Sequence, residues 1–259
     1  RKRNKVAGIY LSGGSGTGKT TFCNLMSAHY GIPLIVNVIR SIHTNNPYIS
    51  RLSKNERQLA YAVEYIKVHH SVNPVRFLSD RSLLNVLAFW NLEPEVMGFL
   101  GLENHQPDLI VLLPVPSYTW YRENIDCFAD PIRINTYKDR AGVTKGRLSE
   151  DEVATLFYEQ DRNMFDLMWK MCDVAKWPKW VPPIERGDYT KYRQTWQQET
   201  QEMILRLWDI PLPSADDLTE EQRQYLIQKG GDNHGADIES EQDRLSGLGG
   251  SSSDDEEVV

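Results

Sequence analysis

Apolar residues follow two alternating patterns along the sequence as far as Pro213. Short apolar runs, several of them rich in β-branched residues, are typical of strands buried inside a sheet. They lie at residues 6–11, 33–39, 75–79 and 109–113, and a shorter one lies at 180–182. The segments between them carry apolar side chains at helical spacing. Strands that alternate with helices predict an α/β fold, with a parallel sheet of about five strands and helices on both faces.

The expected helices are marked by their end signals as well as by their periodicity. Gly31 follows a helix that begins at Thr20, and glycine suits the left-handed conformation that often ends helices. Ser53 and Glu56 form a capping box, in which each side chain accepts a hydrogen bond from the other residue's backbone N–H group. We expect helices at residues 20–30, 53–70, 83–92, 94–102, 150–174 and 189–208.

Composition changes after Pro213, where bulky apolar residues become rare. Residues 214–259 contain 13 acidic and 3 basic residues, a net charge of −10, whereas the whole chain carries −7. Residues 1–213 therefore carry +3, which suits a domain that binds anions such as nucleotides. A segment so poor in apolar residues cannot bury enough surface to offset the entropy lost on ordering. We expect one domain at 1–213 and a largely disordered acidic tail at 214–259.

Cysteine usage and hydropathy indicate a reducing, aqueous compartment. Cys23, Cys127 and Cys172 form no C-x-x-C pair and are odd in number, which argues against a disulfide framework. No apolar run approaches the ~18 residues of a membrane span, and no signal peptide is visible. We therefore expect a cytoplasmic protein without a membrane contact.

The sequence Gly13-Gly14-Ser15-Gly16-Thr17-Gly18-Lys19-Thr20 matches the pattern G-x-x-x-x-G-K-[ST] of phosphate-binding loops. A predicted strand leads into it and a predicted helix leads out of it, as the pattern requires. Glycines allow backbone N–H groups to surround a phosphate, and the helix N-terminus favours negative charge. We expect Lys19 to contact the β- and γ-phosphates of ATP and the Thr20 hydroxyl to bind Mg²⁺. The predicted nucleotide-binding residues are Gly13, Gly14, Ser15, Gly16, Thr17, Gly18, Lys19, Thr20 and Thr21.

Ligands bind at the carboxyl ends of the strands in an open parallel sheet, so the residues that follow each strand are site candidates. The second predicted strand ends near Arg40, and the third ends at Asp80-Arg81. A carboxylate there can order Mg²⁺ or take a proton from an acceptor hydroxyl, and an arginine can hold phosphate oxygens. Asp80 can also cap the helix that follows, which is compatible with a catalytic role. Asp108 precedes its strand, so we expect a turn residue there.

Helical periodicity breaks down between the fourth strand and the helix at 150–174, where many cations are found. A long irregular segment within a domain is usually functional. We expect residues 116–149 to form a mobile lid, whose arginines close over the transferring phosphoryl group and exclude water. A solvated basic loop is the alternative. The candidate lid arginines are Arg122, Arg133, Arg140 and Arg147, and their spacing alone does not select the catalytic one.

Three segments together resemble the nucleoside and nucleotide kinase branch of phosphate-loop proteins, in particular thymidylate-kinase-like enzymes and phage-type ATPase/kinase proteins. They are the loop at 13–20, the Asp80-Arg81-Ser82 helix start within 77–89, and the strand at 107–115 with Arg122 after it. The resemblance spans about residues 6–210. It implies that Asp80 serves Mg²⁺ or the acceptor and that Arg122 belongs to the lid. It also implies that Arg40 and Arg81 contact the acceptor.

The chain departs from this family pattern near the acceptor. Asn85 and Phe89 stand where many relatives have aspartate and tyrosine, and Pro114 stands where an aspartate usually follows the fourth strand. No acidic residue follows the second strand, so the glutamate base of deoxynucleoside kinases is missing. These differences leave the identity of the acceptor open.

The leading hypothesis is an ATP- and Mg²⁺-dependent phosphotransferase that acts on a nucleoside, a nucleotide or a modified base. Its predicted catalytic residues are Lys19, Asp80, Arg81 and Arg122. Two alternatives stay open. The first is a kinase that acts on hydroxymethylated pyrimidines already in DNA, which the charge of residues 1–213 permits although the acidic tail argues mildly against it. The second is a nucleotide-dependent switch without a small acceptor, which the missing acidic residue and the tail weakly favour.

Overall fold

The computed structural model describes residues 4–14, 16–36, 38–71, 76–102, 105–183 and 192–211. Arg1–Asp209 form one compact unit, and Ile210–Val259 form another. Ser15 of the phosphate loop and the predicted tail at 214–259 lie outside the described residues. None of the described helices has the length and apolar content that crossing a membrane requires.

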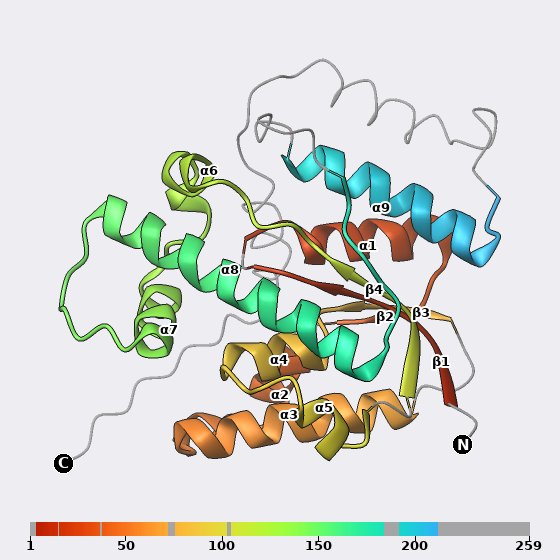
Figure 1. The fold of residues 1–259 in the computed structure, drawn as a ribbon, viewed down its shortest axis with the longest axis horizontal. Coiled ribbons are helices and arrows are strands. Elements are labelled where there is room, and N and C mark those ends of the chain that lie inside the picture. The colour runs from red at the N-terminus through yellow and green to blue at the C-terminus, as the bar shows by residue number, and fades with distance from the viewer. Residues whose placement is uncertain are drawn as a thin grey trace, which may run out of the picture. The chain divides into compact units, whose positions relative to one another are not determined.

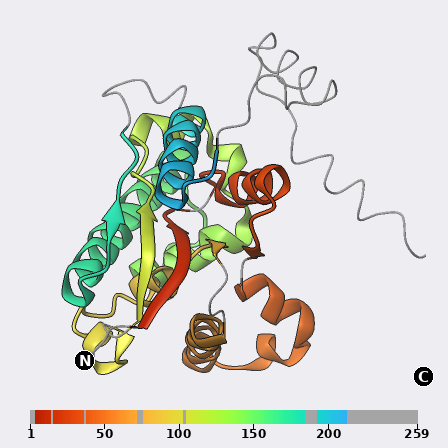
Figure 2. The same cartoon turned by 90° about the vertical axis from the view of Figure 1, so that its right-hand side faces the viewer.

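The first unit is built on one sheet of five parallel strands in the order β2-β3-β1-β4-β5. The predicted parallel sheet is therefore confirmed. Figure 2 shows β1, β4 and β5 side by side. The strands are β1 (Asn4–Ser12), β2 (Leu34–Ile35), β3 (Phe77–Asp80), β4 (His105–Leu112) and β5 (Lys179–Trp180).

Helices cover both faces of this sheet, as predicted. Figure 1 shows α1 and α9 on one side and α3, α4, α5 and α8 on the other. The helices are α1 (Lys19–Tyr30), α2 (Val38–Asn45), α3 (Lys54–Ser71), α4 (Leu83–Phe89), α5 (Val96–Phe99), α6 (Tyr118–Glu123), α7 (Pro131–Ala141), α8 (Glu150–Ala175) and α9 (Tyr192–Trp208), with 3-10 turns η1 (Pro47–Arg51) and η3 (Ile125–Cys127).

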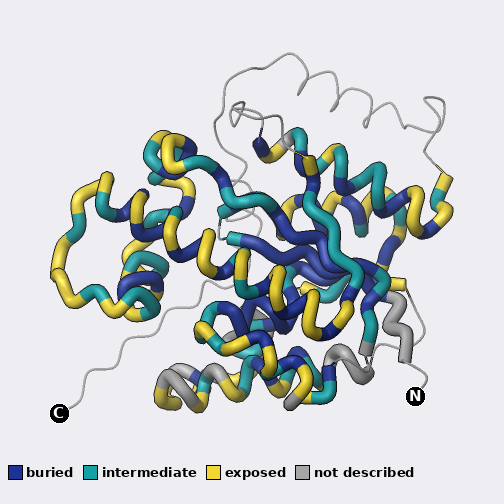
Figure 3. Tube along the Cα trace, viewed as in Figure 1, coloured by how far each residue is buried: buried dark blue, intermediate teal, exposed yellow. Residues whose placement is uncertain are grey.

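The core lies between these layers and centres on β1 and β4. Ile9 and Leu11 on β1, and Ile110 and Val111 on β4, are each 0% exposed. Figure 3 shows the buried strands between helices whose outer faces are exposed. Burying a large aliphatic side chain contributes ~1.5–3 kcal/mol. The central strands therefore form a rigid support for the loop that follows β1.

The predicted second strand at 33–39 is wrong beyond Ile35. β2 pairs with β3 at Leu34 and Ile35, and α2 begins at Val38. Val38 and Ile42 are one helical turn apart, and both line the groove beside β2, so tertiary packing overrides the β-branched composition. Arg40 consequently lies on α2 and not at a strand end.

The segment at 116–149, predicted to be irregular, contains α6, η3 and α7. Ser117 caps α6 by accepting a hydrogen bond from the Trp120 backbone N–H (3.2 Å), and Asp130 caps α7 in the same way through Arg133 (2.9 Å). Asp108 was predicted to be a turn residue, but it lies within β4. Its carboxylate accepts a hydrogen bond from the Trp208 indole (3.0 Å), which ties the end of α9 to the sheet.

Candidate functional site

The phosphate loop joins β1 to α1 at the carboxyl edge of the sheet. Gly16 and Gly18 adopt φ values of 74° and 87°, in the left-handed region that favours glycine. Gly18 is also the N-cap of α1, and Lys19 is the first residue of that helix. The predicted strand–loop–helix arrangement is therefore present. This is a P-loop fold.

The Lys19 side chain folds back over the loop that precedes it. Its Nζ donates hydrogen bonds to the Gly14 carbonyl oxygen (2.5 Å) and to Thr17 Oγ1 (3.0 Å). Only 4% of Lys19 is exposed. Burial, followed by the neighbouring Arg81 charge, lowers the pKa of Lys19 to about 8, whereas Asp80 opposes this change. A polyphosphate beside Lys19 would favour its charged form.

Asp80 meets the phosphate loop, as the strand-end argument predicted. β1 and β3 are parallel with Leu11 opposite Asp80, so Asp80 lies level with the end of β1. Its Oδ2 accepts a hydrogen bond from Thr20 Oγ1 (2.6 Å). Its Oδ1 is buried and has no hydrogen-bond partner among the described residues. A hydroxyl and a carboxylate with a free oxygen form the hard oxygen donor set that Mg²⁺ prefers.

Arg81, Ser82 and Asn85 connect the end of β3 to the loop. Arg81 has a φ of 85°, a left-handed conformation that costs about 1–3 kcal/mol in a non-glycine residue. Ser82 Oγ lies 2.6 Å from Ser12 Oγ. Asn85 Nδ2 donates to the Gly13 carbonyl oxygen (3.3 Å). Asn85, a departure from the family pattern, thus supports the loop through its amide donor, which aspartate lacks.

Tyr65 of α3 was not predicted as a site residue. It is 1% exposed, and among the described residues its hydroxyl has no hydrogen-bond partner. Burial raises the pKa of Tyr65, with a smaller increase from Asp80 and a decrease from Arg81, so all three groups interact electrostatically. The signal available in the sequence was the phenol of Tyr65 itself, three residues after the apolar Ala62 on the predicted helix at 53–70.

Helix α9, the last helix of the unit in the sequence, packs over the phosphate loop. Arg193 Nη2 donates to the Gly16 carbonyl oxygen (2.8 Å), and Trp196 Nε1 donates to the Thr17 carbonyl oxygen (3.1 Å). The Trp196 ring also lies 5.2 Å from that of Phe22 on α1. No motif links residues so distant in sequence, so these contacts were not predicted.

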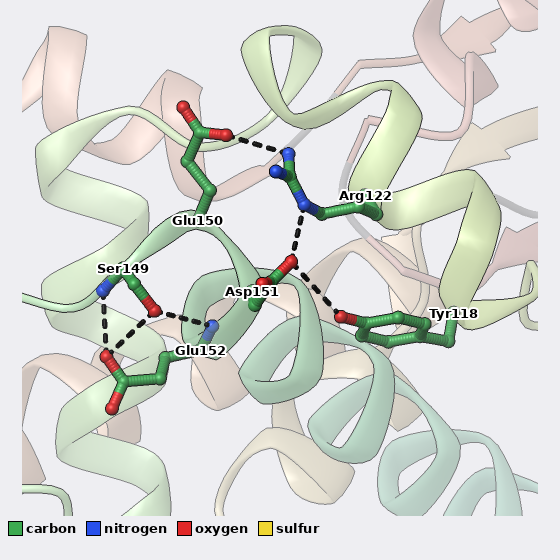
Figure 4. Close-up of polar contacts among 6 residues, drawn as sticks. All are labelled: Tyr118, Arg122, Ser149, Glu150, Asp151 and Glu152. Atoms are coloured by element: carbon green, nitrogen blue, oxygen red, sulfur yellow. Dashed lines mark hydrogen bonds and ion pairs between the residues drawn. The ribbon is translucent and has the colours of Figure 1, made fainter.

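Arg122 and Arg133 form ion pairs at the surface. Figure 4 shows Arg122 between Glu150 and Asp151 at the start of α8, at 2.7 and 2.5 Å. Arg133 Nε lies 2.9 Å from Asp130 Oδ2. Water screens exposed pairs of this kind, so they contribute little to stability, and either arginine can leave its partner at little cost.

Arg140 is held by backbone groups and differs from the other lid candidates. Its guanidinium donates to the carbonyl oxygens of Ala88 (3.0 Å) and Phe89 (3.1 Å), which belong to the last turn of α4. It also donates to the Gln160 carbonyl oxygen (3.1 Å). Arg140 thus caps α4 and joins it to α7 and α8. Arg147 is exposed in the connection between α7 and α8.

A groove of about 780 Å³ opens beside β2, between α2 and α3. Its lining is mainly apolar, and it includes the exposed side chains of Val36, Leu59 and Val63. The residues that line it include neither the phosphate loop nor Asp80. The side chain of Arg40, the other predicted acceptor contact, lies outside the described residues.

No protein-family model and no curated protein matches this sequence. Solved structures of similar fold include deoxyadenosine kinase from M. mycoides with bound dATP, at 15% identity and a TM-score of 0.46 over 76% of this chain and 98% of that one. Shikimate kinase from Bacteroides thetaiotaomicron has 14% identity and a TM-score of 0.45, over 76% and 97%. The thymidine kinase EHV4-TK complexed with TP5A has 13% identity and a TM-score of 0.36, over 76% and 89%.

All three of these structures are kinases. At such identities and TM-scores the likeness concerns only the general arrangement of strands and helices. The P-loop assignment therefore rests on the chain's own loop and sheet order.

Proposed function

We propose that this protein is an ATP- and Mg²⁺-dependent phosphotransferase that transfers the γ-phosphoryl group to a hydroxyl of a nucleoside- or nucleotide-like acceptor. The observation that carries the proposal is the position of Asp80. One of its carboxylate oxygens accepts a hydrogen bond from Thr20, and the other is buried without a partner among the described residues. A buried oxygen without a partner costs about 1–3 kcal/mol, which a metal-bound water or an acceptor hydroxyl would recover.

The donor would be held by the loop and Lys19. The Lys19 ammonium lies against the loop at the Gly14 carbonyl oxygen, so a short movement of its side chain would bring the ammonium to the phosphate oxygens. Thr20 and Asp80 would hold Mg²⁺, which neutralises charge on phosphate oxygens when it is bound. Arg81 is half-buried beside these groups, where its guanidinium could contact acceptor or transferring oxygens.

The acceptor would lie on the β3 side of the loop, near Tyr65. The Tyr65 hydroxyl and Asp80 Oδ1 are two buried polar atoms without partners among the described residues, and the two side chains interact electrostatically. One hydroxyl of an acceptor can hydrogen-bond both of them, by donating its hydrogen to the carboxylate and accepting one from the phenol. Arg122, Arg133 and Arg147 of the lid segment are the candidates for closing over the transferring group.

An assay of ADP release over a panel of nucleosides, nucleoside monophosphates and hydroxymethylpyrimidine DNA tests the proposal. We expect one class of acceptor to stimulate ADP release and to become phosphorylated in a Mg²⁺-dependent manner. A slow ADP release that no acceptor stimulates, but that a protein partner does, would instead identify a nucleotide-dependent switch. Absence of any heat on titration with Mg-ATP would contradict both functions.

A further inference from the structure

A buried carboxylate lies beneath the phosphate loop without belonging to the predicted site. Asp161, near the middle of α8, is 2% exposed. Its Oδ2 accepts a hydrogen bond from the Tyr121 hydroxyl (2.6 Å), and its Oδ1 accepts one from the Tyr137 hydroxyl (2.6 Å). Tyr121 belongs to α6 and Tyr137 to α7. Each helix of the predicted lid segment therefore donates one tyrosine hydrogen bond to the same carboxylate.

The same carboxylate touches the loop at Gly14. A Cβ atom at Gly14 would lie only 2.1 Å from Asp161 Oδ2 and 2.7 Å from its Cγ, so no larger residue fits unless the Asp161 side chain moves. Gly14 is also the residue whose carbonyl oxygen holds Lys19 Nζ and the Thr17 hydroxyl (3.1 Å). One side chain thus joins two lid helices to the part of the loop that positions Lys19.

The negative charge of an ionised Asp161 does not suit a role as a phosphate ligand. Burial raises the pKa of Asp161, while the two tyrosine hydroxyls and the Lys19 and Arg140 charges lower it. An ionised carboxylate next to a polyphosphate opposes its binding. A carboxylate does, however, accept one strong hydrogen bond on each of its two oxygens, whereas an asparagine side chain has an acceptor oxygen on one arm and an amide donor on the other.

We propose that Asp161 is a positioning residue that couples the conformation of the phosphate loop to helices α6 and α7. Through Tyr121 and Tyr137, the placement of the lid segment fixes the carboxylate, and the carboxylate fixes Gly14 and with it Lys19. Removing either tyrosine hydroxyl then loosens the phosphate loop through the change in Asp161. The effect on nucleotide binding rests on the proposed function, whereas the effect on loop mobility does not.

The test uses Tyr121→Phe, Tyr137→Phe and Asp161→Asn in the full chain, with Tyr158→Phe as the matched control. Tyr158 lies on α8, and its ring contacts that of Tyr121 (6.3 Å between centroids), but no hydrogen bond of its hydroxyl to Asp161 is present in the structure. Two quantities are measured for each variant: amide hydrogen exchange across Gly13–Thr20 in nucleotide-free protein, and the Kd of Mg-ADP by calorimetry. Thermal unfolding shows that each variant is folded.

We expect the three variants to exchange the loop amides about tenfold faster than wild type and to bind Mg-ADP about fivefold or more weakly, with the control unchanged. The fold-change in the double variant Tyr121→Phe/Tyr137→Phe should be smaller than the product of the two single fold-changes, because both hydroxyls act through one carboxylate. Variants with a lower unfolding temperature but wild-type loop exchange would overturn the inference. Faster exchange in a protein that binds no Mg-ADP would support the inference and contradict the proposed function.

Discussion

The two sides of the sheet's carboxyl edge differ in how their polar groups are satisfied. On the proposed donor side, around the loop between β1 and α1, Lys19, Thr17 and Asn85 of α4 each make hydrogen bonds within the protein. On the proposed acceptor side, towards β2 and α3, Asp80 Oδ1 and the Tyr65 hydroxyl are buried without partners among the described residues. The donor side is therefore organised before its ligand arrives. The acceptor side carries desolvated atoms that a ligand can complete.

This contrast also separates stability from function. Internal hydrogen bonds on the donor side hold a loop whose glycines adopt left-handed conformations. Unsatisfied atoms on the acceptor side lower stability, as functional groups often do. Substitutions on the two sides should therefore move activity and unfolding free energy in different combinations.

The largest effect is expected at the centre of the donor side. Lys19→Ala should lower the rate of phosphotransfer by on the order of 10³-fold, because it removes a preorganised cation from the phosphates. The fold should persist, since burial already disfavours the Lys19 charge. Steady-state kinetics and thermal unfolding measure both effects, with exposed Lys67→Ala as the control. Phosphotransfer that survives the change would show that the donor is held elsewhere.

Asp80 lies on the border between the two sides, and Asp80→Asn tests its link to the metal. We expect activity to fall by on the order of 10²-fold and the Mg²⁺ concentration needed for half-maximal rate to rise, because a charged oxygen ligand is lost. A titration of rate against Mg²⁺ measures this, and Asp166→Asn, at an exposed position on α8, is the control. An unchanged Mg²⁺ requirement would mean that Asp80 contacts the acceptor and does not bind the metal.

Tyr65→Phe isolates the acceptor side. Removing a buried hydroxyl that has no partner in the described part of the chain should stabilise the substrate-free protein by about 1 kcal/mol, while the KM of the acceptor rises about tenfold and that of ATP stays the same. Urea unfolding and two-substrate kinetics measure these effects. Tyr61→Phe, on the same helix and half-buried, is the control. Loss of stability in Tyr65→Phe would mean that the hydroxyl has a partner within the protein.

The smallest effect concerns thiol labelling, which compares the rigidity of the donor side with that of the surface. Cys23 lies in α1 just after the loop and is buried, whereas Cys127 is exposed. Burial raises the pKa of Cys23, and it raises that of Cys172 to about 12, so both stay protonated as the pH rises from about 7 to 9. Mass spectrometry should find one fast thiol in the folded protein and three in urea. Rapid labelling of Cys23 would show that the donor side opens.

The sequence was sufficient for the features that depend on local pattern and on sheet logic. The loop motif predicted the strand–loop–helix unit, and the strand-end rule predicted that Asp80 lies beside the loop. In the structure Asp80 Oδ2 lies 2.6 Å from Thr20 Oγ1. Helix ends at Gly31 and the Ser53–Glu56 capping box were also confirmed. These features need only a few neighbouring residues to be specified.

Features that depend on how distant elements pack were missed. The second strand was predicted too long, because a β-branched run is compatible with either a strand or the helix that tertiary packing selects. Asp161 occupies a core position one turn after Phe157 and three residues before Met164, both buried. That polar residue in an apolar stripe was visible in the sequence, but its two tyrosine partners and its contact with Gly14 were not.

Helix α9 has a consequence for how the protein is made. The Trp196 indole of α9 bonds the carbonyl oxygen of Thr17, which lies 179 residues earlier in the chain. The loop therefore leaves the ribosome long before α9 does. At typical rates of synthesis the interval is roughly ten to forty seconds. The nascent chain must therefore carry an incompletely covered loop during translation, and chains truncated before α9 should show weakened nucleotide capture even if the sheet has formed.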